Sequence, residues 1–304
     1  MSATPGIAKP SFARLALRTT KLGISIAYFA VRSVWSWVTP VRSGTGVVLY
    51  YHAVPWEYAG RFEEQMRMVA AQTKAVPLAA VDHLPDGTHS VAITFDDALV
   101  SFAKHAVPVL ERWNIPATVF AVVDTLGAAP VWGEHYYSPD ERVMSEDELG
   151  ALPGLISVGS HTLTHPHLLA LSQQEADLEI SESRRKLESL LQKPVRTFSF
   201  PHGEFNEAVV AQCRDSGYER VFSTDPKLLH NGESKFVVGR VAADPWDWTL
   251  EFRLKMLGAY CWQSYLRSMK RRVRRVFLRQ NESGSSQHRD ERPLNPSTHI
   301  PRNS

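Results

Sequence analysis

The chain has 304 residues, of which 43% are hydrophobic and 22% charged, a composition that excludes disorder throughout and allows one large domain or two small ones. The two cysteines, Cys213 and Cys261, are too few for a disulfide scaffold or a cysteine-based zinc site, so histidine and carboxylate would have to hold any metal. The formal net charge is only +2, but the charges are unevenly distributed.

Both ends of the chain are basic and the middle is acidic. Residues 1–43 carry six basic and no acidic side chains, residues 44–262 carry 18 basic and 29 acidic, and residues 263–304 carry ten basic and three acidic. A nucleic-acid-binding fold would concentrate positive charge on the folded domain itself, so this distribution argues against a nucleic-acid partner. It favours basic ends that meet an anionic membrane surface on either side of a central domain at 44–262.

The N-terminal segment, residues 1–43, contains the apolar stretch 22–38, which Arg32 interrupts near its middle. Seventeen residues are the short limit for crossing a bilayer, and an internal arginine makes crossing costly. Trp35 and Trp37 are of the type that favours the headgroup level, and basic residues precede the stretch. We expect a helix that lies in the membrane interface. A secretory signal or single-span anchor, and a helix packed on the protein's own core, are the alternatives.

Between the ends, strand patterns alternate with helix patterns. Ser172 and Glu175 form the capping-box pattern that begins the longest helix. Such alternation implies an α/β fold with parallel strands and outer helices, in which chemistry gathers at the carboxyl ends of the strands. The predicted strands are 46–51, 91–95, 117–123, 156–158 and 196–200, and the predicted helices are 61–71, 101–113 and 173–192.

Three of the predicted strand ends carry unusual polar residues. Asp96 and Asp97 follow the strand at 91–95, and His161 and His165 follow the strand at 156–158. The third end is the Pro-His-Gly sequence at 201–203, where the backbone can approach a ligand closely. Each pattern alone also fits a solvated turn or a chance pair of histidines. Together, one carboxylate and two imidazoles make a three-ligand site with room for water, and the other carboxylate is left to act as a base.

These residues resemble the polysaccharide deacetylase (NodB-homology) family, whose pattern is T-F-D-D, then H-S/T-x-x-H, then a strand that ends in P-Y-G. The resemblance covers about residues 46–260. It implies a partial or distorted (β/α) barrel and metal-dependent removal of acetyl groups from sugars. Position by position, it makes Asp96 the general base and Asp97, His161 and His165 the metal ligands. The backbone N–H of His202, between Pro201 and Gly203, would then help to hold the oxyanion.

The sequence departs from the family pattern at several places. Ala98 replaces a usual glycine, and His202 a usual tyrosine. The late L-x-H motif that supplies the acid histidine is missing, because Leu229-His230 is predicted to be a turn. The first predicted strand ends in Leu-Tyr-Tyr-His instead, which resembles a permuted branch of the family and makes His52 the candidate acid. A core or hydrogen-bonded histidine is the alternative for this residue.

Several other residues have more than one interpretation. Arg240 is a candidate partner for the catalytic aspartate, and a surface ion pair is an equal alternative. Residues 244–248 fit the D-x-x-D-W string of the family in letters, although they come late in the chain. Aromatic residues that would be able to stack on sugar rings, or simply pack the core, are Trp132, Tyr136, Tyr137, Trp246 and Trp248, and His135 is a candidate for a loop over the pocket.

The resemblance therefore predicts a hydrolase that removes acetyl groups from N-acetylated sugars of a polysaccharide or lipid-linked glycan. A carbohydrate O-acetyl esterase of the xylan type and a non-catalytic, metal-bearing carbohydrate-binding module are the alternatives. Asp96 favours catalysis, because a purely binding site has no use for a carboxylate that is not a ligand. Zn²⁺ is the expected metal, and Co²⁺, Ni²⁺ or Mn²⁺ would fit the same ligands.

The C-terminal region is predicted to begin with a basic amphipathic helix within 263–280. Residues 266–280 carry seven basic side chains and no acidic one, with an apolar stripe at helical spacing. This pattern is typical of a membrane-surface or partner-binding segment, and a solvated terminal helix is the alternative. Residues 281–304, rich in serine, proline, asparagine and charge, are predicted to be a disordered tail.

Overall fold

The computed structural model describes residues 12–38, 43–132 and 140–269. It contains two compact units, Met1–Trp262 and Gln263–Ser304. In the second unit, residues 263–269 are helical. The rest of the predicted basic helix and the predicted tail at 281–304 lie outside the described residues.

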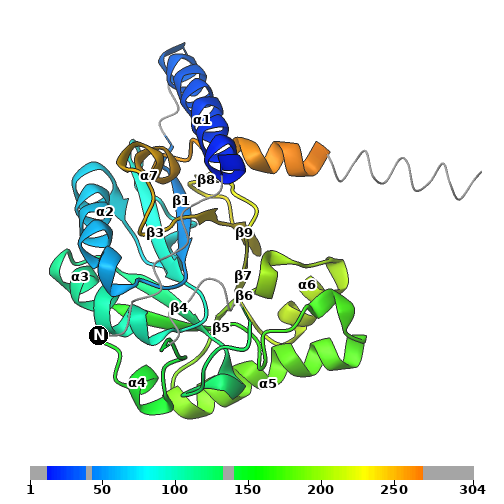
Figure 1. Ribbon diagram of the computed structural model, residues 1–304. Helices are drawn as coiled ribbons and strands as arrows, with labels where there is room; N and C mark the ends of the chain where they lie inside the picture. The colour runs from blue at the N-terminus through cyan, green and yellow to red at the C-terminus, as the bar shows by residue number, and fades with distance from the viewer. Residues whose placement is uncertain (1–11, 39–42, 133–139, 270–304) are drawn as a thin grey trace, which may run out of the picture. The chain divides into compact units, whose positions relative to one another are not determined.

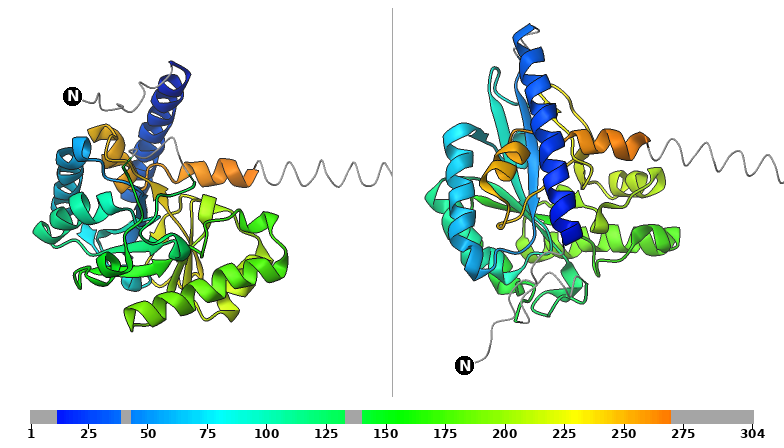
Figure 2. Two further views of the ribbon diagram at one scale, coloured as in Figure 1. Left: turned by 60° about the horizontal axis from the view of Figure 1, so that its bottom comes forward. Right: turned by 45° about the horizontal axis from the view of Figure 1, so that its top comes forward.

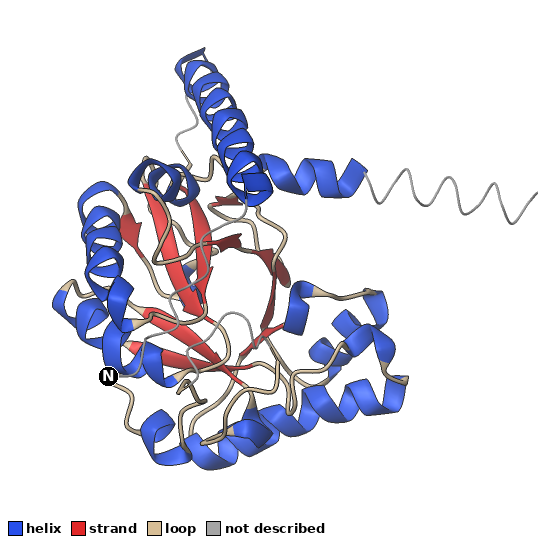
Figure 3. Ribbon diagram, in the orientation of Figure 1, coloured by secondary structure: helices blue, strands red, loops and turns tan. Residues whose placement is uncertain are grey.

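The first unit is built on one curled, almost entirely parallel sheet, which confirms the predicted α/β fold and partial barrel (Figures 1 and 3). Its main path runs β10-β1-β3-β4-β5-β6-β7-β9; β2 pairs with β3, and β8 pairs with β1 in the antiparallel sense. The strands are β1 (Thr45–Tyr51), β2 (Lys74–Ala75), β3 (His89–Phe95), β4 (Ala117–Ala121), β5 (Ile156–Ser160), β6 (Thr197–Ser199), β7 (Arg220–Ser223), β8 (Leu229–His230), β9 (Val237–Gly239) and β10 (Val241–Ala242).

The two ends of this sheet are joined through a single residue, Arg240. Strand β9 pairs with β7 at one end of the path, and β10 pairs with β1 at the other. The Arg240 N–H donates to the carbonyl oxygen of Ser223, while the next residue, Val241, lies opposite Leu49. Since one residue cannot bridge the width of an open sheet, the sheet must curl until its edges meet. This closure places the Arg240 side chain in the interior, where it is fully buried.

Helices cover the outside of the curled sheet (Figure 3). Aromatic residues fill the space between α2 and the sheet: the Tyr51 ring lies 5.4 Å from Phe62 and 5.3 Å from Phe95. The α-helices are α1 (Phe12–Val38), α2 (Ala59–Gln72), α3 (Val107–Arg112), α4 (Glu146–Gly150), α5 (Gln173–Leu191), α6 (Glu207–Asp215) and α7 (Thr249–Met256). Shorter turns are η1 (Trp56–Tyr58), η2 (Leu78–Ala80), the π-helical η3 (Phe102–Ala106), η4 (Val123–Thr125), η5 (Leu168–Ala170) and η6 (Pro201–Gly203).

Two predicted elements differ from the structure. The helix predicted at 101–113 is split into η3 and α3, because Pro108 lacks an N–H and its ring crowds the preceding turn, which widens into a π-helical turn. The turn predicted at Leu229-His230 is wrong: these residues form β8, which pairs with the start of β1. A two-residue strand is too short to show an alternating pattern in the sequence.

Helix α1 begins at Phe12, ten residues before the predicted apolar stretch, and one of its faces packs against the first unit (Figure 2). Leu22 and Phe29 contact the hydrophobic core, and the fully buried Ser25 accepts a hydrogen bond from the Trp262 indole. Arg32 donates to the Leu257 carbonyl oxygen. None of the described helices combines the length and the apolar content that crossing a bilayer requires.

Candidate active site

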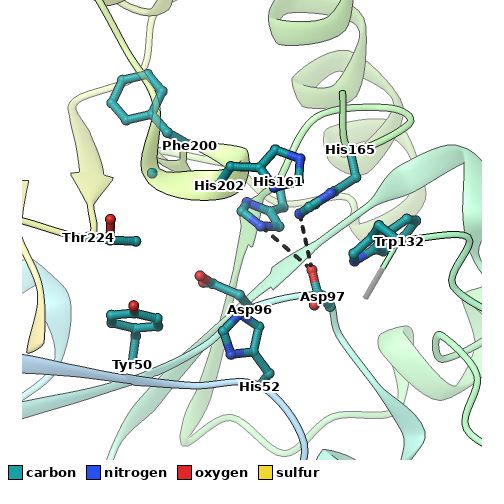
Figure 4. Close-up of a pocket in the computed structure, with 11 residues that line it drawn as sticks. Tyr50, His52, Asp96, Asp97, Trp132, His161, His165, Phe200, His202 and Thr224 are labelled. Carbon is teal, nitrogen blue, oxygen red and sulfur yellow. Dashed lines mark ion pairs between the residues drawn. The ribbon is translucent and has the colours of Figure 1, made fainter. Parts of the chain in front are cut away.

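The ends of β3, β5 and β6 bring the three sequence motifs to one cavity of about 280 Å³ (Figure 4). These strands lie close together in the sheet order, so residues far apart in the chain meet at one edge. The predicted base and the three predicted metal ligands all line this cavity, as does the histidine that follows β1. Its lining residues are Tyr50, His52, Asp96, Asp97, Trp132, His161, His165, Phe200, His202, Gly203 and Thr224.

Asp97, His161 and His165 form a group whose geometry fits one divalent metal ion. Their ligand atoms lie within 4.8 Å of one another. One carboxylate oxygen of Asp97 is 3.6 Å from Nε2 of His161 and 3.6 Å from Nε2 of His165. Burial lowers the pKa of His165 to about 3, so this imidazole is neutral at physiological pH, the form that binds metals.

The ring of His161 is oriented by the neighbouring strand. Its Nδ1 lies 2.8 Å from the carbonyl oxygen of Ser199. A carbonyl oxygen can only accept, so Nδ1 carries the proton and donates it, which leaves a lone pair on Nε2. This hydrogen bond is the kind of outer contact that fixes the tautomer of a metal-binding histidine. The donor set and its orientation therefore fit the predicted metal site.

The loop that carries the two histidines is held by Glu179 of α5. The Glu179 carboxylate accepts hydrogen bonds from the backbone N–H groups of Leu163 and Thr164, at 2.8 and 3.0 Å. It also accepts one from the Thr164 hydroxyl at 2.6 Å. This contact could not be predicted from the sequence, because a glutamate on the surface of a helix has the same local pattern as any solvated acidic residue.

The motif loops contain backbone conformations that are unfavourable for most residues. Among the described residues, Asp97, Ala98, Thr162, His165 and His202 all have positive φ, between 52° and 71°. Such residues persist only where the surroundings fix them, and they gather at functional sites. Ala98 has a left-handed φ, which glycine adopts at a lower conformational cost than alanine.

Gly203 is required for a different reason. A Cβ atom at this position would lie 2.1 Å from the Thr224 hydroxyl oxygen, and the residue has φ +70°. Both constraints exclude a larger residue. The close approach holds the Pro-His-Gly turn against the strand end and keeps it at the cavity wall.

Asp96 forms a buried, two-pronged ion pair with Arg240. The two guanidinium nitrogens lie 2.7 and 2.8 Å from the two carboxylate oxygens. Arg240 also donates to the hydroxyls of Thr94 and Ser199, at 3.1 and 2.7 Å, and its guanidinium lies over the Tyr50 ring. Burial alone would raise the pKa of Asp96, but the guanidinium outweighs burial and holds the pKa well below its ordinary value. The surface ion pair considered for Arg240 is therefore wrong, since this residue is fully buried.

The remaining candidates stand around this centre. His52 follows β1, is exposed, and lies beside Asp96 in the cavity (Figure 4). The His202 ring meets the edge of His165 at 4.6 Å and stacks on His167 at 3.8 Å. Trp132 stacks on the outer side of His165, with ring centroids 4.6 Å apart. His135, Tyr136 and Tyr137, expected near the pocket, lie outside the described residues.

Comparison with known proteins agrees with this geometry. The family described as polysaccharide deacetylase matches residues 83–221, a stretch that contains all three motif loops and leaves out His52 and Arg240. A Bacillus subtilis (strain 168) protein named as polysaccharide deacetylase YxkH is 23% identical over 221 residues, which are 69% of this chain and 75% of that protein. Poly-beta-1,6-N-acetyl-D-glucosamine N-deacetylase of Staphylococcus aureus (strain N315) is 24% identical over 162 residues; the match spans 50% of this chain and about half, 53%, of that relative.

Solved structures show the same fold. Streptococcus pyogenes deacetylase PplD, in complex with acetate, superposes with a TM-score of 0.59 at 18% identity, over 70% of this chain and 98% of that one. IcaB from Ammonifex degensii superposes with a TM-score of 0.57 at 22% identity, over 71% of this chain and 97% of that one. The curled sheet described above is therefore the architecture of these two proteins.

Proposed function

We propose that the chain is a member of the polysaccharide deacetylase family that hydrolyses the carbon–nitrogen bonds of N-acetylated sugars, that its substrate is an N-acetylated glycan at a membrane surface, and that its metal is zinc. The observation that carries the catalytic assignment is the buried Asp96–Arg240 pair beside the Asp97, His161 and His165 group. A carboxylate kept ionised next to a metal site, without belonging to its ligands, is what a hydrolytic base requires.

The first part of the reaction, the attack of water on the acetyl carbonyl, involves the metal ligands and the general base. Asp97, His161 and His165 would hold a divalent cation, which would supply Lewis acidity to a water and to the acetyl carbonyl. Asp96 accepts a proton from the attacking water, and Arg240 keeps this carboxylate ionised and in place.

The other two groups act on the tetrahedral intermediate and its breakdown. The backbone N–H of His202, in the strained turn at the cavity wall, is assigned to the developing oxyanion. His52 donates a proton to the departing nitrogen, which leaves as the amine of the sugar while acetate is released. This placement of an acid histidine directly after β1 supports the permuted arrangement of the motifs.

Zinc is the proposed metal because two imidazoles and one carboxylate are a ligand set that Zn²⁺ accepts, with a position left for water. Cobalt, nickel and manganese share affinity for such ligands. Metal analysis of the purified protein, with activity regained after removal and addition of each ion, tests the assignment.

The leaving group distinguishes an N-deacetylase from an O-acetyl esterase. An amine needs a proton to depart, whereas an alkoxide is a better leaving group, so His52→Gln is expected to slow acetate release from N-acetylglucosamine oligomers by about 10²-fold and from acetylated xylan by much less. Acetate is measured with both substrates and the zinc-loaded protein. His83→Gln, at an exposed position, is the control. Faster release from xylan than from the amide in the unchanged protein would favour the esterase.

Helix α1 supports the membrane part of the proposal, because it turns arginine side chains toward the protein and an apolar face toward solvent, the opposite of an ordinary surface helix. Arg18 and Arg32 point toward the protein and bind Glu251 and the Leu257 carbonyl oxygen. The opposite face is apolar and exposed to solvent. Every exposed position between 22 and 35 is apolar or glycine: Gly23, Ile24, Ile26, Ala27, Ala30, Val31, Val34 and Trp35.

We propose that this face, Gly23 to Trp35, lies in the interface of an anionic bilayer. The segment 1–43 has six basic and no acidic residues, which complements anionic lipid. The apolar surface is also wider than the seam of a coiled coil, whose flanking positions usually carry charges. This argues for lipid over a second copy of the chain.

Vesicle flotation tests the interfacial assignment. The full chain is expected to float with phosphatidylglycerol vesicles, and the double variant Ile24→Glu and Val31→Glu is expected to bind at least about tenfold less, since two side chains lose apolar burial. A matched variant changes Leu169 and Leu178, which are exposed elsewhere, to Glu. Equal flotation of both variants would contradict the proposal. If the unchanged chain is a dimer and the α1 substitutions make it a monomer, the face would be assigned to contact with a second copy instead.

A further inference from the structure

A second cavity, of about 380 Å³, adjoins the active site on the far side of His52. Tyr50 and His52 line both cavities, so the two cavities adjoin at these residues. The outer wall of the second cavity is formed by Asp244 and Trp246, which follow β10. These residues belong to the late Asp-Pro-Trp-Asp-Trp string, which the mechanism above does not use.

The loop that carries Trp246, residues 244–248, is held from three helices. Its backbone carbonyl oxygens accept hydrogen bonds from Gln65 and Arg61 of α2, both at 2.8 Å, and from Arg18 of α1 at 3.1 Å. Inside the loop, the Asp247 carboxylate accepts two hydrogen bonds of 2.7 Å from Lys255 of α7. A loop fixed in this way presents its outward side chains in one arrangement, which lowers the entropic cost of binding a ligand.

The outward side chains suit a sugar ring. Trp246 offers an indole, which the Tyr58 ring supports edge-on at 5.6 Å. Indole faces favour the apolar faces of sugar rings, and a carboxylate such as that of Asp244 accepts hydrogen bonds from sugar hydroxyls. Asp247, by contrast, is buried and occupied by Lys255, so it supports the loop from behind.

We infer that this second cavity binds the sugar residue next to the one that is deacetylated, with Trp246 and Asp244 as its contacts. The inference rests on the proposed function and extends it: the substrate is an oligosaccharide or polymer whose chain passes His52. Because the two cavities share His52 and Tyr50 in their walls, a glycan whose reacting sugar lies in the first cavity has the second cavity beside it for the neighbouring sugar.

Arg18 is a positioning residue for this subsite. Besides binding the Trp246 carbonyl oxygen, it lies over the Trp248 ring at 4.2 Å and donates to Glu251 at 2.7 Å. Helix α1 therefore braces the loop that carries the subsite. The same helix that presents the apolar face, Gly23 to Trp35, supports the wall against which the glycan binds.

The test compares N-acetylglucosamine and its tetramer. Calorimetry uses the full-length Asp96→Asn protein loaded with zinc, because this variant leaves the acetyl groups of the ligands in place. The readout is the Kd for N-acetylglucosamine divided by the Kd for its tetramer. We expect the tetramer to bind at least about tenfold more tightly, and Trp246→Ala added to this background to reduce that ratio about five- to tenfold. Asp244→Asn is expected to reduce it less. Trp56→Ala, at a Trp that is 75% exposed, is the control.

Arg18→Gln is expected to reduce the ratio in the same direction, and Arg18→Lys to restore part of it. Equal ratios in the Trp246→Ala, Asp244→Asn and control proteins would overturn the inference, as would equal affinity for monomer and tetramer. Acetate release by the unchanged enzyme is measured separately. Absence of acetate together with a Trp246-dependent ratio would refute the proposed function and still support the sugar subsite.

Discussion

Asp96→Asn is expected to lower acetate release from N-acetylglucosamine oligomers by about 10²- to 10⁴-fold, the range that a positioned general base contributes. An amide of the same shape keeps a hydrogen bond to Arg240 but accepts no proton from water. Because Asp96 is not among the three residues of the metal group, the variant and the unchanged protein are expected to bind the same amount of zinc per chain. Loss of turnover with retained metal would separate the base from the ligands.

The same substitution at Asp177, an exposed residue of α5, provides the control and should leave the rate unchanged. Activity of Asp96→Asn within about tenfold of the unchanged protein would contradict the role of the base. Loss of zinc from the variant would instead place Asp96 among the metal ligands. Acetate release and metal content are measured on the same preparations.

The parts of the site that are local in the sequence could be predicted. Asp96 and Asp97 directly follow β3, and His161 directly follows β5. In a parallel sheet the strand ends that carry such residues share one edge, so the pattern of strands already implies that they meet. The capping box of Ser172 and Glu175 is likewise present at the start of α5, because its two hydrogen bonds depend only on neighbouring residues.

Arg240 was a candidate partner of the catalytic aspartate in the sequence, but local patterns could not decide between this role and a surface ion pair. It lies 144 positions from Asp96 in the chain, on a stretch between two very short strands. Its burial follows from the closure of the sheet, which depends on every strand between β1 and β9. Glu179 is a similar case, since its contacts with the histidine loop arise only when α5 packs against the carboxyl end of β5.

Helix α1 was only partly foreseeable. The apolar stretch and Arg32 favoured a helix in the membrane interface, with a secretory signal or single-span anchor and a helix packed on the protein's own core as alternatives. Sequence periodicity could not show which face of the helix the protein covers, because that depends on partners such as Glu251 and the carbonyl oxygen of Leu257. The packing leaves the apolar side outside, which gives the interfacial hypothesis a defined surface to test.

Removal of the metal is expected to produce an effect as large as loss of the base. A bound divalent ion contributes several kcal/mol of transition-state stabilisation, and each 1.4 kcal/mol corresponds to about tenfold in rate, so metal-stripped protein should release acetate on the order of 10³-fold more slowly. The fold itself should survive, because Asp97, His161 and His165 sit on loops anchored by contacts that need no metal, such as the Nδ1–H donation from His161 to Ser199.

The most direct measurement is a zinc titration of the stripped protein, with acetate release from the N-acetylglucosamine tetramer followed at each step. The site described here predicts that the rate rises with added zinc and reaches a plateau at one equivalent per chain, and that a His165→Gln protein shows no such rise. Release that is unaffected by stripping, or that is fully restored by zinc in the His165→Gln protein, would contradict deacetylation at the Asp97, His161 and His165 centre.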